Sequence, residues 1–198
     1  PASSVSTAMQ LVAVIFQLQS LQQFGGVSAT HLDWTMVPYV RKSFFKHYNE
    51  IRETANMLTF GLFNIKQKEM LKEDIINTSI NDKFYIGNSC FNVFKRIISK
   101  VALKRTGREI YQSVEGLYHN LNTLQSRSGN QLPFTSINYG TCTLPEGRMV
   151  TNALLDVSME GLGKYHKTSI FPCGIFQYMK GVNDKPGTPN YDLYRKAL

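Results

Sequence analysis

The sequence contains few of the residues from which common catalytic and metal sites are built. Its three cysteines, Cys90, Cys142 and Cys173, lie far apart and form no C-x-x-C pair. This spacing argues against a disulfide framework and offers no zinc motif, so we expect free thiols in a reducing compartment. Cys142 and Cys173 are interpreted as buried, inert thiols. The four histidines are scattered away from any nucleophile motif, and we therefore predict no catalytic residue and no metal ligand.

Long apolar runs are also missing. The longest, residues 11–16, is far shorter than the roughly 20 residues that a membrane span needs. No basic segment precedes an apolar segment of the secretory type, so we expect a cytoplasmic protein with no membrane partner. Walker and Rossmann glycine signatures and the paired carboxylates of glycosidases are absent as well.

What is present is a chain of 198 residues, of which 42% are hydrophobic and 12% aromatic. This composition is typical of a globular protein, and the length suits one domain with its own core. The chain begins at Pro1 without a methionine and ends at Leu198 without a capping signal. We interpret this as a segment of a longer protein.

Positive charge is concentrated in the middle of the chain. Residues 41–108 hold fourteen Lys and Arg against six Asp and Glu, so this block has a net charge of +8, which equals that of the whole chain. A basic block can bind a polyanion, because Lys and Arg displace the counterions condensed around phosphates. The plainer interpretation is a solvated, lysine-rich helical insertion, which we favour for most of the block.

Helical periodicity dominates the first 125 residues. Residues 4–23 predict a helix that Ser4 or Ser6 can cap and that Gly25 and Gly26 end. Its predicted apolar face consists of Val5, Ala8, Met9, Val12, Ile15 and Phe16. A second helix is predicted after Pro38, and residues 49–106 contain several short amphipathic runs.

The clearest helix spans residues 106–125. Five aliphatic residues recur there at alternating spacings of four and three: Ile110, Val114, Leu117, Leu121 and Leu124. Such a narrow seam packs against another helix, either within one chain or across a dimer interface. The spacing does not distinguish these two arrangements.

The last seventy residues alternate between strand and helix patterns. A strand is predicted within residues 132–140, and a helix follows to about Leu162 with Gly163 as its stop. Thr143 and Glu146 have the spacing of a capping box for this helix. A second strand, with Pro172 inside it, is predicted within residues 168–181. We expect a right-handed crossover between parallel strands and an α/β architecture, with the N-terminal helices packed outside.

Polar side chains gather at the carboxyl end of the first predicted strand, where α/β proteins bind ligands. Alternation predicts Ser136 and Asn138 on one face, with Thr141 just beyond the strand. Hydroxyl and amide groups of this kind suit sugar hydroxyls. The loop before the strand can hold a phosphate or be an ordinary polar connection, and it contains Ser128, Gly129, Asn130 and Gln131.

Three stretches of the sequence resemble one enzyme family. They are "HNLNTLQSRSGNQLPFTSINYGT", "SLQQFGGVSATHLDWTMVPYVRKSFFKH" and "IFPCGIFQYMKGVN…PGTPNYDLYRKAL". They resemble the catalytic chain of the class III, oxygen-sensitive ribonucleoside-triphosphate reductases, which are glycyl-radical enzymes, and most of all the form found in T-even-type phages. Residues 49–105 look like a longer, divergent version of a helical connection in that family.

The resemblance implies a fold and an assembly. The family fold is an α/β barrel of ten strands in two five-stranded halves, and the enzyme is a homodimer. Residues 1–125 would form a helical region for dimerisation and allosteric control, and residues 126–198 the first strands and crossover helix of a half-barrel. The effectors would be deoxynucleoside triphosphates or ATP. By analogy, three glutamines would read a base or simply face solvent: Gln17, Gln19 and Gln22. Three cations would hold phosphates: Arg41, Lys42 and Lys46.

The resemblance also implies a chemistry, the reduction of ribonucleoside triphosphates for deoxyribonucleotide biosynthesis and DNA replication. It would use a glycyl radical, formate as reductant, a structural zinc and a radical-SAM activating enzyme. The Met-Gly-Cys loop, the Arg-x-x-Gly-Tyr radical loop and the zinc cysteines of the family do not occur in this sequence. We therefore expect this chain to be inactive alone and to supply the dimer interface, the effector site and part of the substrate cavity. Residues 128–131, Ser136, Asn138 and Thr141 would orient ribose and phosphate.

Two functions of other classes stay open. One is a basic helical module on residues 41–108 that binds nucleic acid, and the other is a structural dimerisation module without a ligand. Salt-sensitive DNA binding that survives loss of residues 126–141 would identify the first. The absence of any thermal shift with nucleotides would favour the second.

Overall fold

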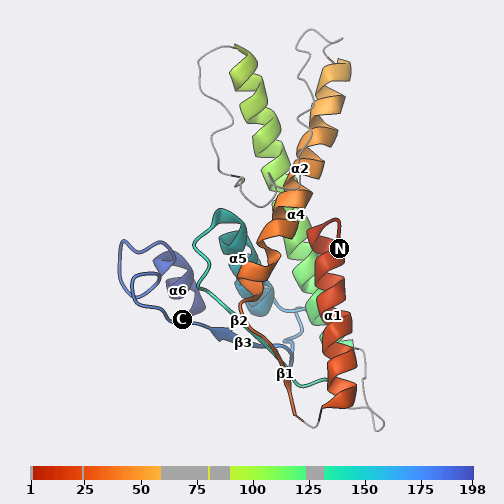
Figure 1. Ribbon diagram of the computed structural model, residues 1–198, viewed down its shortest axis with the longest axis vertical. Coiled ribbons are helices and arrows are strands. Elements are labelled where there is room, and N and C mark those ends of the chain that lie inside the picture. Colours follow the sequence, from red (N-terminus) through yellow and green to blue (C-terminus); the bar gives the residue numbers. More distant parts are fainter. Residues whose placement is uncertain (1, 24, 59–79, 81–89, 124–131) are drawn as a thin grey trace.

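The computed structural model describes residues 2–23, 25–58, 80, 90–123 and 132–198, with backbone only for residues 90–94. The elements in these ranges are α1 (Val5–Gln22), β1 (Val27–Ala29), α2 (Leu32–Leu58), α4 (Cys90–Thr123), β2 (Thr135–Tyr139), α5 (Pro145–Glu160), β3 (Cys173–Phe176) and α6 (Tyr191–Ala197). The far halves of α2 and α4 extend beyond the other described elements, at the top of Figure 1. No helix in the described ranges is both long and apolar enough to cross a membrane.

The three described strands form one parallel sheet in the order β1–β2–β3. Val27 of β1 pairs with Thr135 of β2, and Ser136 of β2 pairs with Cys173 of β3. The parallel pairing of β2 and β3 on either side of α5 confirms the predicted parallel strands and the α/β class; the hand of the crossover stays a prediction. We did not predict β1, because three residues are too short to display alternation.

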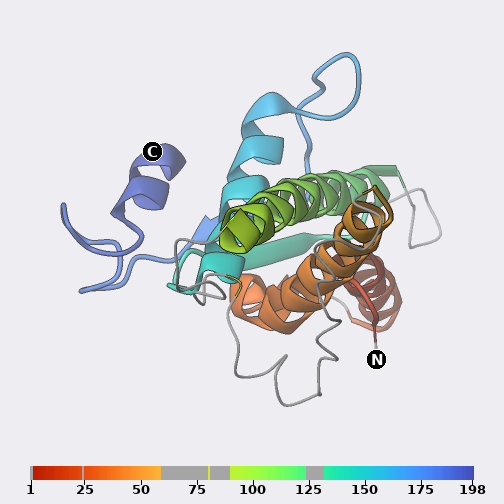
Figure 2. The same ribbon diagram turned by 90° about the horizontal axis from the view of Figure 1, so that it is seen from above.

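Helices cover one face of this sheet. Along β2, Thr135, Ile137 and Tyr139 are buried while Ser136 and Asn138 are half-exposed, as alternation predicted. Ile137 and Tyr139 belong to the main core, which takes residues from α1, α2, α4 and α5. Figure 2 shows α1, α2, α4 and α5 gathered around the sheet. The opposite face of β2 carries the polar side chains.

The aliphatic seam of α4 packs within the chain. Ile110, Val114, Leu117 and Leu121 are all buried, in the same core as residues of α1 and α5. Core packing is therefore the correct interpretation for these four residues. Leu124, the fifth, lies outside the described residues.

Both faces of α1 are apolar, and the sequence did not separate them. Ser4 caps the helix by accepting the N–H of Thr7 at 3.2 Å, as predicted. Val12 is partly buried and packs against the main core, whereas Ile15 is 53% exposed, so the predicted inward face was wrong at Ile15. A second row, the α1 stripe, lies on the exposed side of the helix, and its members are 47–58% exposed: Leu11, Val14, Ile15, Leu18 and Leu21.

The second and third helices are longer than predicted. α2 begins at Leu32, so Pro38 is its seventh residue and does not precede it. The missing proline N–H weakens an isolated helix, but Leu32, Met36 and Val37 are buried there and offset this cost. The short runs predicted in residues 49–58 and 90–106 belong to α2 and α4, whose extended halves pack through Ala55 and Ile98.

The predicted capping box at the start of α5 was wrong. Leu144 is the N-cap residue, and no side chain caps the helix. Glu146 is instead fully buried, and its Oε1 accepts hydrogen bonds from Arg41 Nε at 3.0 Å and from the Ile80 N–H at 2.9 Å. A long-range ion pair thus replaces the local bond.

The predicted limits of the last helix and strand also change. α5 ends at Glu160, and Gly161, not Gly163, is its C-cap residue, with a φ of 76°. A Cβ at Gly161 would lie 2.6 Å from the carbonyl oxygen of His166, so only glycine fits. Pro172 precedes β3 instead of lying inside it.

Candidate functional site

The face of the sheet that the helices leave uncovered carries two of the predicted substrate residues. Ser136 and Asn138 lie on this face of β2, and the Ser28 hydroxyl of β1 donates a 3.5 Å hydrogen bond to Asn138 Oδ1. In register with them on β3 are Cys173 and Ile175, both exposed. The prediction that Cys173 is buried was therefore wrong. Two hydroxyls, an amide and a thiol share this surface.

The turn after β2 is held by one carboxylate. Asp33, in the first turn of α2, is fully buried, and its Oδ2 accepts the N–H groups of Gly140, Thr141 and Cys142 at 3.0, 3.1 and 2.9 Å. Its Oδ1 accepts the N–H of Trp34 at 3.0 Å. These hydrogen bonds solvate a buried negative charge in place of water. Sequence reasoning missed Asp33, because its partners lie more than a hundred residues away.

Two buried asparagines hold the same turn from the other side. Asn190 Nδ2 donates to the carbonyl oxygens of Gly140 and Cys142 at 3.1 and 2.9 Å. Asn183 Nδ2 donates to those of Gly140 and Gln177 at 3.2 and 2.9 Å. Sequence reasoning assigned no role to either asparagine. Together, Asp33 and the asparagines satisfy the polar backbone groups at the carboxyl end of β2.

Thr141, the third predicted substrate residue, lies inside this turn. It is buried, and its hydroxyl oxygen accepts a hydrogen bond from Trp34 Nε1 at 3.1 Å. Trp34 itself is partly exposed. The predicted phosphate loop, Ser128, Gly129, Asn130 and Gln131, lies outside the described residues.

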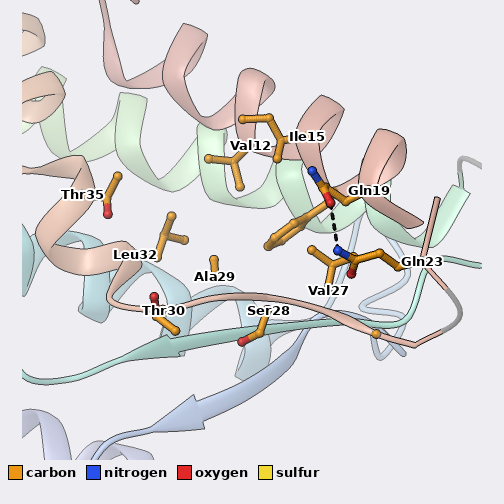
Figure 3. Close-up of a pocket in the computed structure, with 12 residues that line it drawn as sticks. Val12, Ile15, Gln19, Gln23, Val27, Ser28, Ala29, Thr30, Leu32 and Thr35 are labelled. Atoms are coloured by element: carbon orange, nitrogen blue, oxygen red, sulfur yellow. Dashed lines mark hydrogen bonds between the residues drawn. The ribbon is translucent and has the colours of Figure 1, made fainter. Parts of the chain in front are cut away.

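The predicted effector glutamines separate in space. Gln19 lines a pocket of about 440 Å³ between the second half of α1, β1 and the start of α2. Figure 3 shows the Gln19 and Gln23 side chains at one end of this pocket, joined by a 3.0 Å hydrogen bond, and Thr35 at the other. Gln22 is exposed and does not line the pocket, and Gln17 has its Nε2 buried without a hydrogen-bond partner among the described residues.

The predicted phosphate-binding cations do not line this pocket. Arg41 is buried against Glu146 and cannot hold a phosphate while that pair is in place. Lys42 donates to the carbonyl oxygen of Ala2 at 2.9 Å, with its Nζ 5.2 Å from the centre of the Tyr39 ring. Lys46 is exposed. The described part of one chain therefore brings Gln19 to a pocket without these three cations.

The described residues contain no group of three or more His, Cys, Asp and Glu side chains that could hold a metal ion. The two cysteines whose side chains the structure describes differ in environment. Burial raises the pKa of the Cys142 thiol from 9.0 to about 11, whereas Cys173 is exposed on the sheet. Cys142 is thus a neutral, buried thiol near neutral pH, as the sequence predicted.

Replacing Asp33 by Asn should destabilise the chain by about 1–3 kcal/mol, because three buried N–H groups lose their charged acceptor. Urea unfolding followed by circular dichroism measures this loss, and hydrogen exchange should show faster opening at residues 140–142. Asp184→Asn is the matched control, since Asp184 accepts a single N–H, that of Gly181, near the surface. Unchanged exchange at residues 140–142 in Asp33→Asn would contradict this role.

Alkylation at about pH 8 should modify Cys173 and leave Cys142 intact in the folded chain. At that pH, a thiol with a pKa of about 11 has about 100-fold less thiolate than one at 9.0. Peptide mapping by mass spectrometry after iodoacetamide treatment reports each site. Urea should make the two cysteines react alike, and equal labelling without urea would refute the burial of Cys142.

The chain is similar to known proteins over its whole length. A family model described as anaerobic ribonucleoside-triphosphate reductase matches residues 1–198. Proteins of that name from Haemophilus influenzae and Escherichia coli K12 are each 29% identical over 198 residues, which cover 100% of this chain and 22% of the relative. The protein of that name from Enterobacteria phage T4 is 26% identical over 195 residues, 98% of this chain and 26% of the relative. The chain thus spans about a quarter of the length of these relatives.

Proposed function

Because the chain belongs to the anaerobic ribonucleoside-triphosphate reductase family, we propose that it is a segment of an enzyme that reduces ribonucleoside triphosphates to deoxyribonucleotides. The observation that carries this proposal is the family match over all 198 residues. The glycyl radical, formate, the structural zinc and the activating enzyme would act at residues outside this segment. The segment itself would contribute binding surfaces.

The uncovered face of the sheet would be one wall of the substrate cavity. Ser136 and Asn138 offer hydroxyl and amide groups that can bind the hydroxyls of a ribose. The edges of β1 and β3 are unpaired among the described residues, so further strands can extend the sheet into a half-barrel that encloses this face. Once enclosed, the polar groups need partners, because a buried unsatisfied group costs about 1–3 kcal/mol. A bound nucleotide would provide them.

The α1 stripe supports a homodimer. A row of five large apolar side chains exposed on one helix is unfavourable in water and packs well against a copy of itself across a two-fold axis. Ile15 belongs to both the stripe and the wall of the Gln19 pocket. A second chain on the stripe would therefore close the pocket that we propose for a deoxynucleoside triphosphate or ATP effector.

In that effector site, Gln19 and its partner Gln23 would hydrogen-bond the base. The pocket described in one chain is lined by neutral side chains. Phosphate binding therefore requires cations from the second chain or from residues outside the described ranges. Lys42 and Lys46 stay candidates from a partner chain, together with Gln17 and Gln22.

Asn138→Ala in the parent enzyme should lower kcat/KM for ribonucleotide reduction about tenfold, the effect of losing one substrate hydrogen bond. Deoxynucleotide formation under anaerobic conditions measures it. The matched control is Asn152→Ala, which removes an amide from α5 that contacts Lys196, on the covered side of the sheet. Wild-type kcat/KM in Asn138→Ala would reject the substrate-wall assignment.

Leu18→Asp should turn the parent enzyme from a dimer into monomers, because it introduces a charge into the middle of the α1 stripe. Sedimentation velocity measures the change. Met159→Asp, at a similarly exposed apolar residue of α5, should leave the dimer intact. A dimer that persists in Leu18→Asp, or dissociation by both variants alike, would rule out the stripe as the interface.

A further inference from the structure

The extended half of α4 carries a concentration of positive charge that the proposed function does not use. Residues 95–108 contain six cations and no Asp or Glu, which gives this part of the helix a charge of +6: Lys95, Arg96, Lys100, Lys104, Arg105 and Arg108. In Figure 1 this is the upper part of α4, which projects away from the sheet together with α2. Positive charge is thus concentrated on a projecting part of one helix.

Four of these cations form a row along the helix, the α4 basic row: Arg96, Lys100, Lys104 and Arg108. Each member is four residues from the next, so neighbours lie about 6 Å apart along the axis and about 40° apart around it. All four are exposed, as is Arg105. None of these five has an ion pair or hydrogen bond within the described part of the chain.

The other face of α4 explains why the row points away from α2. Ile98, Ala102 and Thr106 are buried, so this side of the helix packs in the interior. Glu109, the first acid after the row, points inward as well. Its Oε1 accepts a hydrogen bond from Ser43 at 3.1 Å, and its Oε2 lies 2.8 Å from His47 Nε2.

Acids on the neighbouring helix do not neutralise the row either. On α2, Glu50 lies 3.5 Å from His47, and Glu53 contacts Arg52 at 3.3 Å. Among the residues that the structure describes, no acid therefore pairs with the α4 basic row. Its cations repel one another, and a bound anion would reduce this repulsion.

We propose that the α4 basic row binds the phosphate backbone of a nucleic acid without reading its sequence. The row extends for about 18 Å, and duplex DNA presents a negative charge every 1.7 Å or so of its axis, so several phosphates lie opposite it. Binding releases the condensed counterions, which is the source of the affinity. The inference rests on charge and geometry alone and is independent of the proposed reductase function.

A nucleic acid suits this surface better than a lipid membrane does. A helix that lies on a membrane needs a broad apolar face opposite its charges. The apolar side chains exposed beside the row are Ile97, Val101 and Leu103, which lie among the cations instead of opposite them. The face opposite the row is already packed in the interior.

The test uses the full-length chain that contains these residues and two labelled DNA duplexes of about 20 base pairs with unrelated sequences. Fluorescence anisotropy measures affinity from about 50 to 200 mM salt. We expect equal affinity for both duplexes and a steep loss with salt. Replacing the row by glutamine (Arg96→Gln, Lys100→Gln, Lys104→Gln, Arg108→Gln) should flatten the log–log salt slope by about 0.9 for each phosphate that the variant no longer neutralises. Affinity at low salt should fall at least about tenfold.

The matched control removes four exposed lysines from loops, with the same change in net charge: Lys164→Gln, Lys167→Gln, Lys180→Gln and Lys185→Gln. Glutamine is a good helix former, and circular dichroism checks that both variants fold. The proposal holds if the row variant loses binding and the loop variant keeps it. It is overturned if the wild type does not bind, if both variants weaken equally, or if the chain binds phosphatidylserine vesicles and no DNA.

Discussion

The buried carboxylate of Asp33 is the interaction on which the arrangement of the sheet and its neighbouring helices depends. Its Oδ2 accepts three consecutive backbone N–H groups after β2, and its Oδ1 accepts the N–H of Trp34 in the first turn of α2. A negative charge in the interior is stable only with such partners, and the partners in turn need the charge. The bond network therefore joins the start of α2 to the end of β2, and it orients the turn that leads into α5.

A sheet with one packed and one polar face follows from this arrangement. The helices bury Ile137 and Tyr139, while Ser136, Asn138 and Ser28 remain on a surface that no described helix covers. Both edges of this sheet are unpaired among the described residues, which is compatible with the proposed half-barrel. The proposed substrate role therefore also depends on residues beyond the segment, which would have to enclose this polar face.

The helices α1 and α4 each combine a packed face with a second face that stays exposed among the described residues. On α1 the second face is apolar, which favours a copy of the same helix; on α4 it is basic, which favours a polyanion. The two surfaces favour different partners. Any close contact that buries apolar area stabilises the first, whereas only negative charge stabilises the exposed cations of the second. The proposed dimer and the proposed nucleic-acid contact therefore use different helices and different physics.

The sequence by itself determined what local periodicity encodes: the α/β class, the parallel strands on either side of α5, the helix predicted at residues 4–23, the apolar seam of α4 and, through its motifs, the family. It left open whether that seam packs within one chain. The tertiary structure decided the rest. In it, Glu146 pairs with Arg41 instead of capping its own helix, and one apolar face of α1 is buried while the other is exposed. The helix α2 continues through Pro38. The side chains of Asp33, Asn183 and Asn190 hold the turn after β2. Strand alternation predicted the face on which Ser136 and Asn138 lie, but no sequence pattern predicted the pocket that Gln19 lines. The physical reason is that these hydrogen bonds, ion pairs and contacts join residues that are distant in the chain, and their partners are known only once the elements are packed.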